Sequence, residues 1–328
     1  MQTIWKAVAS TLALAASMGA AQGETLLRLS TYVNESDIRY QGMTHFAKLV
    51  GEKTNGSVKV ELFPSSTLHG WSEGIDALQG GISDMSWLVS DARLPCYTQT
   101  YFYPAEVSLT NQIALDAAFN DLVRDELGSV GLVPIMNSNY SYDQEWWFRE
   151  PGVDLAKLDG KLVRSIGPLV SQMIEAWGGA PVFVSPKEVF QSAERGVVDG
   201  INMGVATYSS WKLWTVMPHM INANLFYGNT IYAMNQKKFD SLTAEEQTAV
   251  REAARETETW LQPRYEAFVD QAVGNAVMLG GGSATTLPAK DRAALIASVS
   301  GAWNEQVDKA CGPDLGKAYR ALLASHAP

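Results

Sequence analysis

The run from Gly160 to Gly204 constrains the fold of this chain more than any other stretch. Its apolar pattern indicates strands at 161–165 and 180–185, helices at 168–177 and 186–195, and a further strand beginning near residue 200. Strands that alternate with helices in this way form a parallel sheet. Ligands of such open sheets bind beyond the carboxyl ends of the strands, and Arg164 lies at such an end.

The same alternation occurs earlier in the chain. Strands are predicted at 26–32, 58–63 and 83–89, and helices at 37–52 and 73–79. One α/β domain therefore starts near Leu26 and a second near Trp146. We predict that residues 24–141 and 230–270 form the first domain and that residues 142–229 and 271–328 form the second. The length of 328 residues and a hydrophobic content of 46% suit two globular domains.

The last third of the chain has a different pattern. Thr243 and the two glutamates that follow it are typical of a helix start, with a side-chain cap and an acidic first turn. Helical spacing continues to about residue 279, where three glycines end it. Pro263 lies inside this helix and is predicted to kink it. Two further helices are expected within 289–323.

The amino terminus has the pattern of a secretory signal peptide. Lys6 precedes an apolar run at 7–16, and small residues follow at 19–21. A membrane anchor is disfavoured because the apolar run is much shorter than a bilayer requires. We therefore expect loss of residues 1–23 on export to the periplasm, without direct membrane insertion. Loss of Lys6 changes the formal charge from -10 to -11, and so acidic a protein is not expected to bind nucleic acid.

Cysteine and histidine usage bears on metals and redox chemistry. Export to an oxidising compartment would permit a disulfide between Cys96 and Cys311, but the sequence leaves open whether they meet. Neither cysteine lies beside a histidine or in a CxxC motif, and the four histidines lack metal-ligand spacing. We expect no metal and no cofactor.

Motifs of common enzymes were also sought. The patterns GxSxG, HExxH and GxGxxG and the P-loop do not occur, so we expect no catalytic residues. Asp143 and Glu145 could act as a carboxylate pair on a glycan, although neighbouring acids on a loop are usually solvated. An exported two-domain hydrolase for a small anionic or glycan substrate remains the alternative function. An interaction module such as a periplasmic chemoreceptor adaptor is a third.

Aromatic residues gather at predicted strand ends and in the loops that follow them. They are Tyr32, Trp71, Trp87, Tyr140, Tyr142, Trp146, Trp147, Tyr208, Trp211, Trp214 and Tyr227. Core packing is the ordinary role of any one of them. Trp146 and Trp147 are adjacent on a predicted strand, so we expect one of them to face a cleft or solvent. A cleft lined by aromatic rings around one arginine would suit a small carboxylate with an apolar or aromatic body.

Three stretches resemble the solute-binding proteins of TRAP transporters, the DctP type. The central stretch is GKLVR, a helix, and then GGAPVFVSPKEVFQSAERGVVDG, ending at Gly200. Residues 46–68 resemble the first helix and strand of that family, and residues 78–85 resemble its second pair. The resemblance covers residues from about 27 to about 235 in the same order. It implies a two-domain periplasmic binding protein fold, with a ligand cleft between the domains and a long helix that crosses both.

The resemblance also carries single positions across. Arg164 matches the arginine that pairs with the ligand carboxylate, for which a planar fork of donors is suited. On spacing alone, a surface ion pair or a snorkelling side chain would be the ordinary interpretation. Asn202 and Met203 depart from the Glu-Asn or tryptophan that the family often has after its V-D-G strand. Asn224 and Tyr227 lie in a returning segment that borders the family's cleft.

Further candidates complete the predicted ligand-binding set, namely Tyr32, Trp71, Glu73, Trp87 and Trp146. Glu73 starts a predicted helix, so it could accept a ligand hydroxyl or simply complement the helix dipole. No second basic residue stands near Gln144 and Glu145, where many dicarboxylate and sialic-acid binders of the family place one. A monocarboxylate is therefore expected, unless Arg39 or Arg149 reaches the site.

The predicted function is capture of a small organic acid outside the cytoplasm. The acid is expected to be a monocarboxylate of aromatic, hydroxy or keto character. The partners implied are this ligand and the TRAP membrane permease subunits that receive it, and the protein is expected to be a monomer or dimer.

Overall fold

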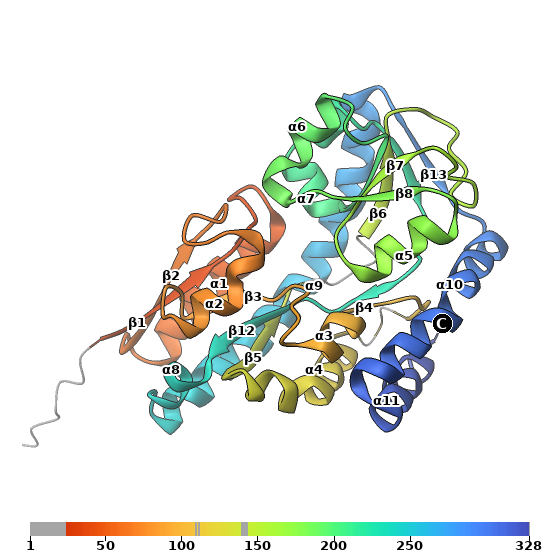
Figure 1. Cartoon of the computed structure of the whole chain (residues 1–328). Helices are drawn as coiled ribbons and strands as arrows, with labels where there is room; N and C mark the ends of the chain where they lie inside the picture. Colours follow the sequence, from red (N-terminus) through yellow and green to blue (C-terminus); the bar gives the residue numbers. More distant parts are fainter. Residues whose placement is uncertain (1–23, 109, 111, 139–143, 328) are drawn as a thin grey trace, which may run out of the picture.

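The computed structural model describes residues 24–108, 110, 112–138 and 144–327. Its strands form sheets of five, six and two strands. Figure 1 shows the five-stranded sheet with its red and orange strands, the yellow β5 and the teal β12, and the six-stranded sheet among mostly green elements. The predicted signal peptide, residues 1–23, lies outside the described residues, as do Tyr140, Tyr142 and Asp143.

The first lobe is built on the five-stranded sheet. In order, its strands are β2 (Val58–Phe63), β1 (Thr25–Ser30), β3 (Met85–Trp87), β12 (Ile231–Asn235) and β5 (Leu132–Asn137). β1 pairs in parallel with β2 and β3, whereas β12 runs antiparallel to β3 and β5. Leu27 and Leu29 alternate along β1 with more exposed residues, so they reach the core together with Met43 and Phe46 of α1 (Ile38–Lys53).

The second lobe is built on the six-stranded sheet. In order, its strands are β13 (Ser283–Thr286), β10 (His219–Asn222), β6 (Gln144–Phe148), β9 (Gly200–Gly204), β7 (Leu162–Ser165) and β8 (Ala180–Phe183). β7 lies parallel to both β8 and β9, with α5 (Pro168–Ala176) and α6 (Val189–Glu194) as the connecting helices. The alternation predicted from Gly160 to Gly204 is therefore confirmed.

Shorter helices complete the two lobes. They are η1 (Trp71–Glu73), α2 (Gly74–Gln79), α4 (Gln112–Ser129) and α8 (Gln236–Asp240) beside the first sheet, and η3 (Pro186–Glu188), α7 (Val205–Ser210) and η4 (Leu213–Thr215) beside the second. Each large sheet takes its strands from one of the two predicted domains. The domain boundaries themselves stay a prediction, and the one at 141/142 falls outside the described residues.

One expectation about the second sheet is wrong. Trp146 and Trp147 do point to opposite faces of β6, but both side chains are 0% exposed. Trp146 packs on Trp177, with ring centroids 5.3 Å apart, and Trp147 stacks on Tyr208. Since β6 is an inner strand with packed side chains on both faces, neither direction leads to a cleft or to solvent.

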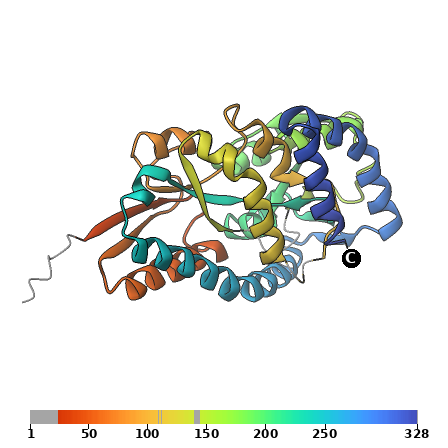
Figure 2. The ribbon, with the colours of Figure 1, turned by 90° about the horizontal axis from the view of Figure 1, so that it is seen from below.

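Helix α9 (Ala244–Gly280) is the long helix that the sequence predicts. The side chain of Thr243 accepts the Glu246 N–H at 3.2 Å, and the Glu246 carboxylate accepts the Thr243 N–H at 2.9 Å. The helix continues through Pro263 and ends at Gly281, which has a left-handed φ of 65°. It contacts α1 and β5 of the first lobe and α7 and β13 of the second, as the lengthwise view of Figure 2 shows.

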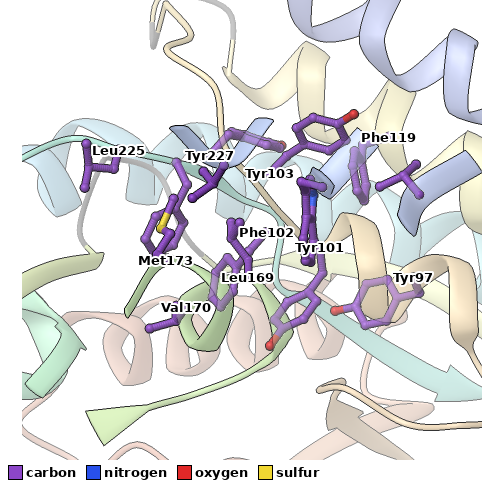
Figure 3. Packing of buried hydrophobic residues seen from close by; sticks show 14 of the residues in the cluster. Tyr97, Tyr101, Phe102, Tyr103, Phe119, Leu169, Val170, Met173, Leu225 and Tyr227 are labelled. Atoms are coloured by element: carbon purple, nitrogen blue, oxygen red, sulfur yellow. The ribbon is translucent and has the colours of Figure 1, made fainter. Parts of the chain in front are cut away.

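A third packing region joins the lobes. It contains α3 (Pro95–Thr100), the two-stranded sheet of β4 (Phe102–Tyr103) and β11 (Tyr227–Gly228), α10 (Ala289–Cys311) and α11 (Pro313–Ala324). Helix α10 contacts α3 and α5, and α11 contacts α4. Figure 3 shows the aromatic and aliphatic side chains of this core, among them Phe102, Phe119 and Leu169.

The disulfide that the sequence leaves open is present. Cys96 of α3 and Cys311 of α10 are bonded, with their Cα atoms 4.6 Å apart. Within the part of the chain that the structure describes, no helix is long and apolar enough to cross a membrane.

Candidate functional site

Arg164 is the residue around which the site is built. Its neighbour Val163 points into the core of the joining region, so Arg164 points to the opposite face of β7. The side chain is 2% exposed. Its Nε donates to the carbonyl of Val184 at 3.1 Å, and its Nη1 donates to the carbonyl of Asn202 at 2.7 Å. Backbone carbonyls therefore hold the guanidinium in place.

Among the described residues, the charge of Arg164 has no counter-ion. Within the described residues, no carboxylate pairs with it, and its Nη2 makes no hydrogen bond. Burial lowers the pKa of the Arg164 guanidinium to about 9, while the phenols of Tyr32 and Tyr101 act in the opposite direction. Charged side chains are almost never fully buried without a partner, so this arrangement is typical of a ligand site rather than of a core.

Three predicted aromatic residues come together in the first lobe. The Tyr32 ring meets Trp71 edge-on with centroids 4.7 Å apart, and meets Trp87 at 5.5 Å. Trp87 is fully buried, and its indole Nε1 has no hydrogen-bond partner. His69 stacks on Trp87 at 4.8 Å, and its Nε2 lies 3.0 Å from the Ser86 hydroxyl. The group joins apolar ring faces to an unsatisfied donor.

Tyr101 is a residue of the site that the sequence analysis missed. Its hydroxyl donates to the carbonyl of Ile166 at 3.3 Å and accepts from Ser90 at 3.2 Å. Ile166 directly follows the strand that carries Arg164. Burial raises the pKa of Tyr101 to about 12. No local signal marks this tyrosine, because its contact with the second lobe depends on the arrangement of the whole chain.

Arg39 does reach this region, whereas Arg149 does not. Arg39 is 1% exposed, and its guanidinium donates to the Tyr32 hydroxyl at 2.6 Å and to the Asp37 carboxylate at 2.6 and 2.8 Å. It also donates to the hydroxyl of Thr207 in the second lobe. Arg149 lies beyond the opposite end of β6, where its backbone N–H donates to Asp199.

The other predicted residues of the second lobe are more scattered. The sulfur of Met203 lies 3.8 Å from Arg164 Nη1. The strand register places the side chain of Asn202 on the opposite face, with Trp146. There its Nδ2 donates to the Glu145 carbonyl at 3.2 Å, and its buried Oδ1 has no partner. Trp146 itself lies in the core.

Three predicted residues lie apart from Arg164 and the aromatic group. Tyr227 is buried and donates its hydroxyl to Asp116. Asn224 has a left-handed φ of 49°, and its backbone N–H donates to the Glu145 carboxylate at 3.2 Å. Glu73 is exposed and accepts the Gly70 N–H at 2.6 Å, so it caps its helix, as one of the two interpretations of the sequence expects.

Metal-binding potential was checked for the same region. Among residues 24–108, 110, 112–138 and 144–327, no group of three or more His, Cys, Asp or Glu side chains could hold a metal ion.

Comparison with known proteins decides the family. The model of the DctP family, bacterial extracellular solute-binding protein family 7, matches residues 29–310. The chain belongs to this family. It is thus a solute-binding protein of the TRAP type, as the resemblance predicted, and its α/β architecture with a long crossing helix is that of the family.

Individual relatives of this DctP-family chain are distant in sequence. The C4-dicarboxylate-binding periplasmic protein DctP of Rhodobacter capsulatus is 25% identical over 76% of both chains. A Bordetella pertussis extracytoplasmic solute receptor binding pyroglutamic acid has a TM-score of 0.82 at 18% identity, covering 92% of this chain and 100% of its own. A Desulfovibrio salexigens TRAP solute-binding protein with bound orotic acid has a TM-score of 0.79 at 20% identity, covering 93% and 100%.

Proposed function

We propose that this protein captures a small monocarboxylate with a flat or aromatic body and delivers it to a membrane permease. The observation that carries the proposal is the buried Arg164 guanidinium without a carboxylate partner. A second candidate function is not favoured, because the chain belongs to a family of transport proteins and the hydrolase alternative has no supporting residue cluster.

The energetic argument starts from desolvation. Removing a charged group from water costs several kcal/mol unless another charge or strong hydrogen bonds compensate. Two backbone carbonyls compensate Arg164 only in part, and both Nη2 donors stay available. A ligand carboxylate supplies the missing negative charge and can accept two parallel hydrogen bonds from the guanidinium. The site is therefore more stable when an acid occupies it.

The aromatic group supplies the second half of the recognition. Tyr32, Trp71 and Trp87 offer ring faces and edges on which an apolar or planar ligand body can pack. Among the described residues, the buried Trp87 indole N–H has no hydrogen-bond partner. The acids bound by the Bordetella and Desulfovibrio proteins are ring compounds, which supports this ligand class.

Contacts between the lobes suggest how occupancy is signalled. Lys187 of the second lobe donates to the Ser66 carbonyl at 3.3 Å, and Asn34 of the first lobe donates to the Ser210 carbonyl at 3.3 Å. A ligand that touches both lobes favours the closed arrangement over the open one by its differential affinity. We infer that the permease recognises the closed form, and that export guided by residues 1–23 brings the protein to the periplasm.

A ligand screen tests this proposal. Protein expressed from the complete chain is heated in the presence of monocarboxylates, including pyroglutamate and orotate, and of dicarboxylates and sulfonates. A ligand that binds only the folded state raises the melting temperature. Calorimetry then gives the affinity, and a mass measurement of the recovered ligand shows whether it is unchanged, as expected for a binding protein but not for a hydrolase.

Arg164→Ala and Arg164→Lys test the contact itself. We expect Arg164→Ala to weaken binding by about 2–3 kcal/mol, the size of a lost charged hydrogen-bond pair. Arg164→Lys should also bind poorly, because a point charge lacks the fork. Arg149→Ala, at the far end of the same sheet, is the matched control and should bind normally. Normal binding by folded Arg164→Ala would remove Arg164 from the site.

A further inference from the structure

A second guanidinium borders the proposed site and already has most of its donors in use. Arg39 uses four of its five N–H donors, one from Nε, two from Nη2 and one from Nη1. The acceptors are the Asp37 carboxylate, the Thr207 hydroxyl and the Tyr32 hydroxyl. Arg164, by contrast, keeps its charge uncompensated. The two arginines therefore differ in what they can offer to a ligand.

Asp37 neutralises Arg39 by a fork-to-fork ion pair. Its two carboxylate oxygens accept from Nε at 2.8 Å and from Nη2 at 2.6 Å, and both residues are buried. Asp37 is also the N-cap of α1, where it accepts the backbone N–H of Arg39 at 2.9 Å. The start of the helix thus fixes the carboxylate against the guanidinium two residues later.

Both guanidiniums contact one short connection of the second lobe. Arg164 donates to the carbonyl of Asn202 in β9, and Arg39 donates to the hydroxyl of Thr207 in the helix that directly follows. Tyr32 of the first lobe interacts with both arginines. Its hydroxyl accepts a hydrogen bond from Arg39, and its phenol acts to raise the pKa of Arg164. The two cations therefore border the same region between the lobes.

We propose that Asp37 is a specificity-determining residue, which neutralises Arg39 and so limits the site to ligands with a single carboxylate. This inference rests on the proposed function of Arg164. Arg39 contributes one positive charge and Asp37 one negative charge, so of these three buried groups only Arg164 remains to be matched. Glu145, a buried acid on the same face of the sheet as Arg164, accepts the backbone N–H groups of Ala223 and Asn224.

A second carboxylate on the ligand would have to be buried without a counter-ion. Arg39 could pair with this second carboxylate only if its ion pair with Asp37 were broken. Asp37 would then be the buried charge without a counter-ion. The wild-type protein is therefore expected to prefer a half-ester to the parent diacid. We therefore attribute the preference for the half-ester to the Asp37–Arg39 ion pair and not to Arg164.

Glutarate and monomethyl glutarate are the probes, since they share one carbon chain and differ by one negative charge and one methyl group. Calorimetry on wild-type protein should show the half-ester binding at least roughly tenfold more tightly than the diacid. In Asp37→Asn, the ratio of the two affinities should shift by at least roughly tenfold towards glutarate. Asparagine preserves the N-cap of α1, so this variant is expected to fold, with its melting temperature as the check.

Two further variants control for unrelated effects. Asp84→Asn breaks another Asp–Arg fork of the first lobe, with Arg28, at the amino end of β3, and should leave the ratio unchanged. Asp37→Asn combined with Arg39→Met removes the freed charge and should cancel the gain of glutarate binding. Pyroglutamate is titrated into wild type and Arg164→Ala as a test of the proposed function itself.

The outcomes separate the two claims. If Asp37→Asn folds and the ratio of the affinities for glutarate and its half-ester is unchanged, the inference is overturned. The proposed function still stands in that case if binding of pyroglutamate or the half-ester depends on Arg164. Should Asp37→Asn fail to fold, the wild-type titration still decides, because a preference for glutarate over its half-ester overturns the inference. Loss of Arg164 dependence for every acid would instead refute the proposed function.

Discussion

Glu258 of α9 gives the stability of this protein a defined dependence on pH. Its carboxylate accepts the backbone N–H of Asn137, the last residue of β5, at 2.8 Å. Burial raises the pKa of Glu258 from its usual 4.5 to about 7, while the Asn137 N–H and Arg255 act in the opposite direction. Burial likewise raises the pKa of Asp116, and the nearby Glu258 carboxylate acts in the same direction.

The sign follows from proton linkage. The folded protein holds a proton on Glu258 that the unfolded chain releases above pH 4.5, so the contribution is fully present below pH 4.5. It is lost as the pH rises through about 7. A difference of 7 minus 4.5, at 1.36 kcal/mol per unit, corresponds to about 3 kcal/mol. Glu258→Gln keeps a carbonyl oxygen for Asn137 and has no proton to lose.

Urea unfolding, followed by tryptophan fluorescence, tests this reasoning. The stability of Glu258→Gln minus that of wild type should grow by about 3 kcal/mol between pH 4.5 and 8. Taking the difference removes the contributions of carboxylates that do not interact with Glu258, so among the described carboxylates Asp116 is the coupled group that remains. Glu266→Gln, an exposed glutamate of the same helix, should show a constant difference. A constant difference for Glu258→Gln would refute the argument.

Two other substitutions address the joining region and the contact between the lobes. Replacing Cys96 and Cys311 by alanine opens a loop with a sequence separation of 215 residues. Loop entropy then predicts that the free energy of unfolding falls by about 5 kcal/mol, seen as a lower urea midpoint than that of the oxidised protein. Equal midpoints would contradict this prediction. In Gly167→Ala the new Cβ would overlap the Tyr101 hydroxyl, so we expect about tenfold weaker ligand binding in calorimetry. Adding Tyr101→Phe removes the overlapped oxygen and should restore most of the affinity, whereas normal binding by Gly167→Ala alone would show that this contact does not matter.

Local sequence patterns were sufficient for most of the fold. The order of β7, α5, β8, α6 and β9 follows from apolar spacing and from glycine and proline positions, which act within a few residues. The cap at Thr243 likewise placed the start of α9 correctly. Boundaries moved by a few residues where a short 3-10 turn precedes a helix, as at Pro186–Glu188.

Features that depend on distant segments could not be predicted in this way. Alternation correctly separated Trp146 from Trp147, but whether each face is covered depends on helices from other parts of the chain. Asp37 could be predicted as a helix cap, yet nothing near it shows that Arg39 reaches Thr207 in the other lobe. Arg164 became a candidate from its place at a strand end and mainly from the resemblance, since the lack of a counter-ion among the described residues is a property of the folded chain.

The bond between Cys96 and Cys311 also has a consequence for how the chain is made. With only two cysteines in the chain, one intramolecular pairing exists, and scrambled isomers of the monomer cannot form. The Cys96 thiol nevertheless stays unpaired until Cys311, 215 positions later in the chain, has been synthesised. Maturation therefore requires an oxidant that acts after Cys311 has been synthesised, and it does not require an isomerase that rearranges incorrect disulfides.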